Sequence, residues 1–214
     1  MSEASKVSFP RRTAAKARTR QRIEEAARRL FVTLGYGDAT MAAIAEAADI
    51  HITTLFTHFA SKRELAAAIA VRAGERFEEI VTMQRAQGVP VLAFWRNQVA
   101  RIAHAYERDG DGQINLGRAL AGEPELLPVW YGHQRLQIDL MTDYIAAELG
   151  IDAAKDRRAQ MAAAMLVAGG RMAFDSWMES GGAGDLVAEN ERLLDAAEAL
   201  LAGGLPLIRR DARG

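Results

Sequence analysis

Residues 40–59 read TMAAIAEAADIHITTLFTHF, and this segment gives the strongest structural signal in the chain. Thr40 is a suitable N-cap, and apolar residues recur at helical spacing over residues 41–48. Residues 49–51 are expected to form a tight connection to a second short helix over residues 52–58. Two short helices joined by such a turn are typical of a helix-turn-helix. On the pattern alone, a two-helix corner of an ordinary helical bundle is the alternative.

The second helix of this pair is expected to bury one face and to expose the other. Ala45 is small enough to let the two helices cross closely. Ile50, Leu55 and Phe59 would point back toward a core. The opposite face would then be free to enter the major groove of DNA. It carries His51, Ile52, Thr53, Phe56 and Thr57.

The remainder of the chain also shows helical patterning. Of its 214 residues, 50% are hydrophobic, and no segment alternates apolar and polar residues for long enough to predict a strand. Residues 23–34 form one apolar stripe at helical spacing. We therefore expect an all-α fold, with Asp152 and Asp185 at the starts of its last two helices, where a carboxylate can cap free N–H groups. The helices, about nine in number, are predicted over residues 13–34, 41–48, 52–58, 62–87, 90–107, 114–120, 125–149, 152–179 and 185–202.

Charge divides the chain into two parts. Residues 1–63 carry a net charge of +5, whereas residues 64–214 carry −6. A basic front on an acidic body suggests that only the front meets a polyanion, although a solvated basic helix end would give the same balance. We expect a helix-turn-helix DNA-binding domain with a basic N-terminal arm over residues 1–62. A larger helical domain for ligand binding and dimerisation would follow over residues 63–214.

Several classes of chemistry are excluded by what the sequence lacks. It has no cysteine, so thiolate catalysis, disulfides and cysteine-ligated metal sites are ruled out. Its 4 histidines have no metal-ligand spacing, and none of the common catalytic or nucleotide-binding motifs is present. No apolar run approaches the ~20 residues that cross a bilayer, and residues 1–22 contain no apolar leader segment. We expect no catalytic residue, no metal, no cofactor and no membrane partner, and a cytoplasmic location.

A set of motifs runs through residues 18–69. They are Ala-Ala-x-x-Leu-Phe at 26–31, the Gly-Tyr turn at 35–36, Thr40, Ile44-Ala45 and Thr54-Leu55-Phe56-x-His58-Phe59-x-Ser61-Lys62. Together they are similar to the DNA-binding domain of the TetR family of bacterial transcriptional regulators. The resemblance implies a homodimeric repressor, bound to a palindromic double-stranded operator and released by a small-molecule effector. A helical small-molecule-binding protein or a cofactor-free enzyme that does not bind DNA is the alternative.

The resemblance also assigns individual DNA contacts. Phosphate contacts fall on Thr40, Thr54, Phe56, His58 and Lys62. Hydroxyl, imidazole and ammonium groups near a helix N-terminus suit phosphate oxygens. The bases would be read by His51, Ile52, Thr53 and Thr57. An arm preceding the apolar stripe of the first helix either reaches the backbone or minor groove or stays solvated, and it carries Lys16, Arg18, Arg20 and Arg22.

Four positions depart from the family pattern. Asp49 replaces the usual glycine of the turn and can adopt a left-handed backbone at a small cost. His51 stands where a serine usually starts the second helix, so that cap is lost or replaced. Phe56 replaces the usual tyrosine and cannot donate a hydroxyl to phosphate, whereas Ile52 could pack on a thymine methyl group. These changes leave the operator sequence unpredictable.

The later helices are expected to hold an effector and the dimer interface. Residues 116–201 are more loosely similar to TetR regulators that sense fatty acyl-CoA, so we expect a mainly apolar effector, with acyl-CoA as one candidate. Small residues of 152–179 and leucines of 185–202 would form the homodimer's four-helix bundle, or would pack within one chain. Aromatic and polar residues that could contact the effector, or that could serve only the core and surface, are Trp95, Tyr106, Asn115, Arg118, Trp130, His133 and Phe174.

Overall fold

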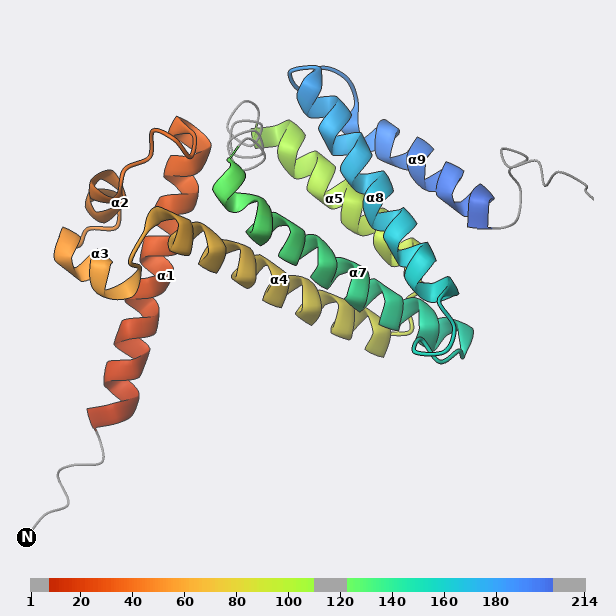
Figure 1. Ribbon diagram of the computed structural model, residues 1–214, viewed down its shortest axis with the longest axis horizontal. Helices are drawn as coiled ribbons and strands as arrows, with labels where there is room; N and C mark the ends of the chain where they lie inside the picture. Colours follow the sequence, from red (N-terminus) through yellow and green to blue (C-terminus); the bar gives the residue numbers. More distant parts are fainter. Residues whose placement is uncertain (1–7, 110–122, 202–214) are drawn as a thin grey trace, which may run out of the picture. The chain divides into compact units, whose positions relative to one another are not determined.

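A computed structural model of the chain describes residues 8–109 and 123–201 (Figure 1). Every regular element in these two ranges is a helix, which confirms the expected all-α fold. The elements are α1 (Ser8–Leu34), α2 (Met41–Ala47), α3 (Ile52–His58), α4 (Lys62–Ala86), α5 (Val91–Asp109), the 3₁₀ helix η1 (Pro124–Leu126), α7 (Leu127–Leu149), α8 (Arg158–Glu179) and α9 (Leu186–Leu201). The helix expected over residues 114–120 lies outside the described residues.

The chain forms two compact units, which are described separately. The first unit contains α1, α2, α3, the part of α4 up to Ala73 and, among the described residues, the stretch from Glu123 to Tyr131. The second contains α4 from Gly74, α5, α7 from Gly132, α8 and α9. α4 and α7 are therefore continuous helices with residues in both units.

The first unit is built on the apolar face of α1. Four members of the predicted stripe are buried: Ile23, Ala26, Ala27 and Phe31. Its last member, Leu34, is exposed. The buried side chains that complete this core are Tyr36, Ala39, Ile44, Ala45, Ala48, Leu55, Phe59, Leu65, Ala66 and Leu126. Because α2 and α3 have only 7 residues each, this burial stabilises them more than their intrinsic helix propensity does.

A buried carboxylate connects α1 to α4 inside the first unit. The side chain of Glu24 is only 6% exposed. Its two oxygens accept from Arg72 Nε of α4 at 2.5 Å and pair with Arg20 Nε of α1 at 3.2 Å. A carboxylate is tolerated at this depth because both oxygens have cationic partners.

The second unit has its own core, with aromatic residues of α4 and α5 at its centre. Phe77 packs against Phe94 and Trp95, with ring centroids 6.2 and 6.3 Å apart. α7 comes very close to α4 at Gly74, because a Cβ added there would lie 2.6 Å from Leu136 Cδ2. The close approach of the two helices explains why a glycine occupies the interior of α4.

α8 and α9 run antiparallel and side by side within the second unit (Figure 1). α9 is also tied to α5 by Arg96, whose guanidinium donates to the carboxylates of Glu191, Asp195 and Glu198. The three acidic residues follow one face of α9, since their spacing is four and then three residues. These hydrogen bonds raise the pKa of Arg96 above its ordinary value.

Two helix starts differ from the prediction. α1 begins at Ser8, ahead of the expected start at residue 13, and α8 begins at Arg158 rather than near residue 152. Asp152 caps a turn, where its carboxylate accepts an N–H two residues along the chain at 2.9 Å. Asp185 caps α9 as expected, accepting an N–H of its first turn at 2.8 Å. An aspartate before a polar segment suits a turn as well as a helix start, which explains the wrong assignment of Asp152.

Candidate nucleic-acid interface

The connection between α2 and α3 is a left-handed turn centred on Asp49. Among the described residues, Asp49 is the one non-glycine residue with a positive φ, at 52°. The N–H groups of Asp49 and Ile50 donate to the carbonyls of Glu46 and Ala45, at 2.9 and 3.0 Å, and so close the end of α2. The expectation that Asp49 can adopt a left-handed backbone is confirmed.

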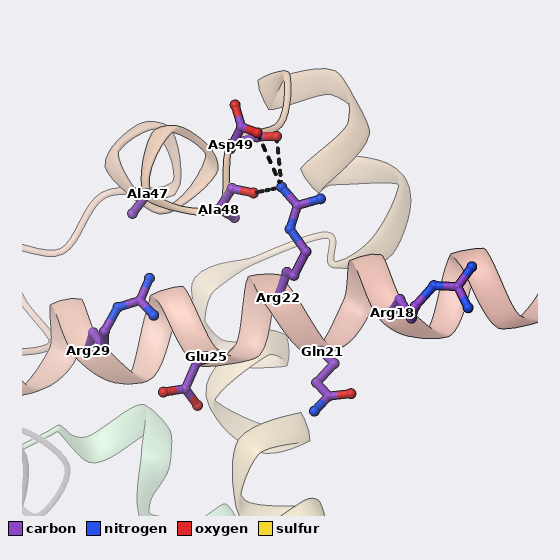
Figure 2. Close-up of a pocket in the computed structure, with 8 residues that line it drawn as sticks. All are labelled: Arg18, Gln21, Arg22, Glu25, Arg29, Ala47, Ala48 and Asp49. Atoms are coloured by element: carbon purple, nitrogen blue, oxygen red, sulfur yellow. Dashed lines mark hydrogen bonds and ion pairs between the residues drawn. The ribbon is translucent and has the colours of Figure 1, made fainter.

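Arg22 of α1 holds this turn from outside (Figure 2). Its Nη2 donates to the carbonyl oxygens of Ala48 at 2.5 Å and Asp49 at 3.1 Å, and it lies 3.6 Å from the Asp49 carboxylate. Carbonyls at a helix C-terminus lack partners within the helix and carry partial negative charge, so a guanidinium both satisfies and neutralises them. Arg22 is therefore part of the structure that sets the direction of α3.

The four basic residues predicted to form an N-terminal arm lie in a helix instead. They are Lys16, Arg18, Arg20 and Arg22 of α1. Arg20 donates to the carbonyl of His58 at 3.1 Å, and its guanidinium carbon lies 4.1 Å from the centroid of the Phe59 ring. The alanine-rich run at 14–17 favours helix, which explains why α1 extends through this region. Lys16 and Arg18 are exposed and stay available to a phosphate backbone.

Both helices of the motif have a side-chain cap at the N-terminus. Thr40 Oγ1 accepts the N–H of Ala43 at 3.1 Å. His51 takes the position usual for serine, and its Nδ1 accepts the N–H of Thr53 at 3.4 Å and lies 2.8 Å from Thr53 Oγ1. The cap of α3 is therefore replaced rather than lost, although its hydrogen bond to the backbone is long.

One face of α3 is exposed, opposite the buried side chain of Leu55. The exposed side chains are His51, Thr53, Phe56 and Thr57. Phe56 is 51% exposed although it is aromatic, whereas Thr54 is half-buried. Hydroxyl and imidazole groups can hydrogen-bond to base edges, and a phenyl ring offers an apolar contact.

Two predicted DNA contacts are less accessible than the pattern indicated. Ile52 is half-buried against the core of the first unit, so it faces outward only in part. His58 is half-buried, and its Nδ1 has no hydrogen-bond partner within residues 8–109 and 123–201. Burial, together with the charges of Lys16 and Arg20, lowers the pKa of His58 below its ordinary value. The ring is therefore neutral near pH 7 and can offer phosphate a hydrogen bond but no charge.

Lys62, the first residue of α4, contacts the turn that follows α1. Its Nζ donates to the carbonyls of Tyr36 at 2.5 Å and Gly37 at 2.9 Å, and it lies 4.4 Å from the centroid of the Tyr36 ring. An ammonium group has three donors, so one remains for a phosphate. Sequence reasoning missed the contact with the turn, because it joins residues that are far apart in the chain.

The start of α4 also carries a capping box that sequence reasoning missed. Ser61 Oγ accepts the N–H of Glu64 at 3.1 Å, and Glu64 Oε2 accepts the N–H of Ala60 at 2.7 Å. The pattern Ser-x-x-Glu at 61–64 is the sequence signal for it. Because a carboxylate already occupies this helix N-terminus, a phosphate would meet Lys62 and its flanking groups rather than open backbone N–H groups.

The sequence of this domain matches a known family. Residues 23–69 fit the model described as bacterial regulatory proteins, tetR family. Over 165 residues the chain is 29% identical to the HTH-type transcriptional regulator TcmR of Streptomyces glaucescens, across 75% of this chain and 73% of that protein. Residues 23–69 therefore form a DNA-binding domain of the TetR type. The relative that shares this domain is a transcriptional regulator of the helix-turn-helix type.

Solved structures agree with this TetR assignment at the level of the fold. GusR of Salmonella enterica has a TM-score of 0.64 at 24% identity, covering 86% of this chain and 96% of GusR. FadR of Bacillus subtilis, solved in complex with stearoyl-CoA, has a TM-score of 0.62 at 15% identity, covering 86% of this chain and 98% of FadR. At such identities the likeness shows a shared fold, a TetR helix-turn-helix domain followed by a helical C-terminal domain.

The seven predicted effector-binding residues include Trp95, His133 and Phe174, which lie in the second unit. Trp95 is 4% exposed in the core of the second unit, and its Nε1 has no hydrogen-bond partner among the described residues. His133 Nδ1, also in the second unit, is buried and equally without a partner there, and burial lowers the pKa of His133. Phe174 is half-buried in the second unit, with its ring 6.3 Å from that of Trp177.

The other four predicted effector-binding residues are Trp130, Tyr106, Asn115 and Arg118. Trp130 is half-buried and belongs to the first unit. Tyr106 lies in the last part of α5, and Asn115 and Arg118 lie outside the described residues.

Metal and membrane features were also sought in the part of the chain that the structure describes. No group of three or more histidine or acidic side chains there is arranged to hold a metal ion. None of the helices there combines the length and the apolar character that a membrane span requires.

Proposed function

We propose that this TetR-family chain is a cytoplasmic homodimeric repressor that leaves a roughly palindromic operator when a small, mainly apolar effector binds. The observation that carries the proposal is the exposed face of α3 on a helix whose opposite side is core, with Phe56 uncovered at 51%. A dimer presents two such faces, which suits half-sites about one turn of DNA (~34–36 Å) apart or somewhat more.

Within this proposal the residues of the motif divide by their chemistry. Base reading is assigned to His51, Thr53 and Thr57 and to the exposed part of Ile52. Phosphate contact is assigned to Thr40, Thr54, Phe56, His58 and Lys62. We place DNA binding in residues 1–62, and effector binding and dimerisation in residues 63–214.

The proposed dimer interface rests on an apolar stripe of α8 that the described residues leave largely exposed. Its members, spaced by four, three and four residues, are Met161, Met165, Ala168 and Met172. Met161 is 65% exposed and Met172 is 60% exposed, and Leu200 and Leu201 at the end of α9 are exposed as well. A continuous apolar stripe of this kind marks an interaction surface, and we assign it to a second copy of the chain.

The proposed effector contacts rest on two buried polar atoms, Trp95 Nε1 and His133 Nδ1. Leaving such an atom without a hydrogen bond costs about 1–3 kcal/mol, so a bound molecule that supplies the bond gains affinity. The surrounding core is apolar and aromatic, which favours an effector with a large apolar body and few hydrogen-bonding groups. Acyl-CoA is a candidate of this kind, and the similarly folded FadR of Bacillus subtilis was solved with stearoyl-CoA.

The experiment that tests the proposal is selection of duplexes from a random pool by the full chain, followed by binding titrations with the enriched duplex. We expect a palindrome to be enriched, and Thr53→Ala to change the preference at one base pair without changing stability. Thr82→Ala is the matched control, because Thr82 is an exposed threonine in the second unit.

A different outcome would favour another function. A chain that binds acyl-CoA but shows no salt-dependent affinity for any duplex would be a helical small-molecule-binding protein. Turnover of the bound acyl-CoA would make it a cofactor-free enzyme.

A further inference from the structure

Tyr36 lies where two helices begin within the first unit. The side chain is 2% exposed, and Tyr36 lies two residues after the end of α1. On one side Lys62, the first residue of α4, lies over its ring and binds its carbonyl oxygen. On the other side its hydroxyl donates to Glu125 Oε1 at 2.7 Å, and Glu125 belongs to η1, which runs directly into α7.

The η1 segment is also fixed to the first unit by an apolar contact. Leu126 is 2% exposed and belongs to the same core cluster as Tyr36 and Phe31. The helix expected from residue 125 therefore begins as a separate 3₁₀ turn that is embedded in the DNA-binding core. This anchoring was not visible in the sequence, because the two contacting segments are about ninety positions apart.

Both helices that start at this junction continue into the core of the second unit. α4 contributes Phe77 and Val81 to that core, and α7 contributes Met141 and Ile145. α4 is therefore buried in both cores, whereas α7 is buried in the second core and follows directly after η1, which is buried in the first. Because each helix is continuous, a displacement of α7 in the second unit shifts Glu125 at its start. A displacement of α4 in the second unit likewise shifts Lys62.

We propose that Tyr36 and Glu125 are positioning residues that couple the start of α7 to the DNA-binding surface. While the hydrogen bond is made, Tyr36 holds Lys62 and the turn at 35–37 in the arrangement that leads to Thr40 at the start of α2. When the bond is broken, Lys62 and this turn lose their common support. This inference rests on the proposed function, in which an effector controls operator binding.

The hydrogen bond joins a buried side chain to an exposed one, which makes it suitable for a switch. Glu125 is exposed, so its carboxylate is solvated as soon as it leaves Tyr36. The Tyr36 hydroxyl is then left inside the core without a hydrogen-bond partner. Breaking the bond therefore destabilises the first unit. Burial and the carboxylates of Glu125 and Glu123 raise the pKa of Tyr36, so the hydroxyl remains a donor across the physiological pH range.

The test is amide hydrogen exchange in residues 123–131 of the full chain, with and without the duplex that the native chain selects. The variants are Tyr36→Phe, Glu125→Gln and Glu125→Ala. The matched control is Tyr144→Phe, since Tyr144 is also a buried tyrosine whose hydroxyl donates a hydrogen bond, to the carbonyl of Val89 at 2.6 Å.

In the native chain we expect the duplex to slow this exchange by about fivefold or more, the low end of ordinary coupling between sites. Tyr36→Phe and Glu125→Ala should remove the effect and weaken duplex binding by the same factor, because coupling is reciprocal. The double variant should be no weaker than either single variant. Glu125→Gln, which keeps an uncharged acceptor, should retain part of the effect, and Tyr144→Phe should retain all of it.

The contradicting results are distinct. If the duplex binds the native chain but does not change exchange in residues 123–131, the coupling is overturned and the proposed function stands. Equal loss of coupling in Tyr144→Phe would also overturn it, because general destabilisation would then explain the data. If the native chain binds no duplex, the proposed function fails and the coupling fails with it.

Discussion

Asp49 sets the direction of α3 through one dihedral angle, φ 52°. For a residue with a Cβ, this left-handed conformation costs roughly 1–2 kcal/mol. The cost is lower for aspartate than for most residues, because its short polar side chain can form local hydrogen bonds. Arg22 supplies the local compensation by binding the Asp49 carbonyl and lying near its carboxylate. The usual glycine can therefore be absent without loss of the turn.

This explanation predicts different changes in the free energy of unfolding for two substitutions at one position. Asp49→Gly should change the free energy of unfolding by less than about 0.5 kcal/mol. Glycine relieves the strain of the left-handed backbone, and this relief offsets the lost ion pair. Asp49→Ala should lower it by about 1 kcal/mol, since alanine keeps the Cβ and loses the polar group. Urea denaturation measures both. A more stable alanine than glycine variant would contradict the left-handed turn.

His133 should make stability depend on pH. Burial lowers the pKa of His133 in the folded chain, so the unfolded chain binds the proton more readily. Its contribution is therefore fully present above the unfolded pKa of about 6.5 and is lost as the pH falls below that value toward the lowered pKa. His133→Gln should lose less thermal stability between pH 7.5 and 5 than the native chain, in melts at ~0.5 unit steps. Some dependence should remain, because the pKa of His58 is lowered too. Identical profiles for the native chain and the variant would contradict the burial of this ring.

At the scale of elements, the sequence predicted what depends on local pattern. The stripe of α1 and the bounds of α3 follow from apolar spacing within one segment. Asp152 was predicted to cap a helix but caps a turn. Its carboxylate can accept a nearby backbone N–H in either setting, so the sequence does not distinguish them. The contacts of Lys62 and Glu125 with Tyr36 could not be predicted, because they require the tertiary fold. The effector site is the part that the sequence predicted least, since core aromatics and ligand-binding aromatics share one pattern.

The connection between α1 and α4 predicts a large difference between two adjacent glutamates. Glu24→Ala removes the buried carboxylate and leaves Arg20 and Arg72 without a common partner, which should cost about 2 kcal/mol of unfolding free energy. Glu25→Ala should cost less than about 0.5 kcal/mol, since Glu25 is exposed and forms a surface ion pair with Arg28. Denaturation in urea compares the two directly. Equal losses would show that Glu24 does not connect the helices.

The proposed dimer interface is tested on the exposed stripe of α8. Leu194, one of the leucines expected at the interface, is not a suitable position for this test, because it is buried in the core of its own chain. Met161→Glu and Met172→Glu should each bury an unpaired charge in the dimer and weaken it by about 3 kcal/mol or more, seen as monomer in sedimentation velocity. Met83→Glu is the control, because Met83 of α4 is an exposed methionine away from the stripe. Helical dimers from both α8 variants would exclude this face.

At the scale of the whole molecule, the proposed regulation needs only a modest energy difference. An effector releases DNA if it binds more tightly to the conformation whose DNA-binding domains are wrongly spaced. Tenfold release requires about 1.4 kcal/mol of such preference, which is within the ordinary range of coupling between sites. α4 can carry this difference because it has residues in the cores of both units, and α7 can carry it because it continues from η1, whose Leu126 is buried in the first core. Operator DNA must then weaken effector binding by the same factor.

The most direct test of the central claim is a fluorescence anisotropy titration of the selected palindromic duplex and of a scrambled duplex of equal length, at low and moderate salt. We expect the palindrome to bind about a thousandfold more tightly than the scrambled duplex. Its affinity should fall steeply with salt, by roughly 10³-fold or more between about 50 and 200 mM if six or more phosphates are contacted. Equal affinity for the two duplexes, or affinity that does not change with salt, would contradict sequence-specific DNA binding by this chain.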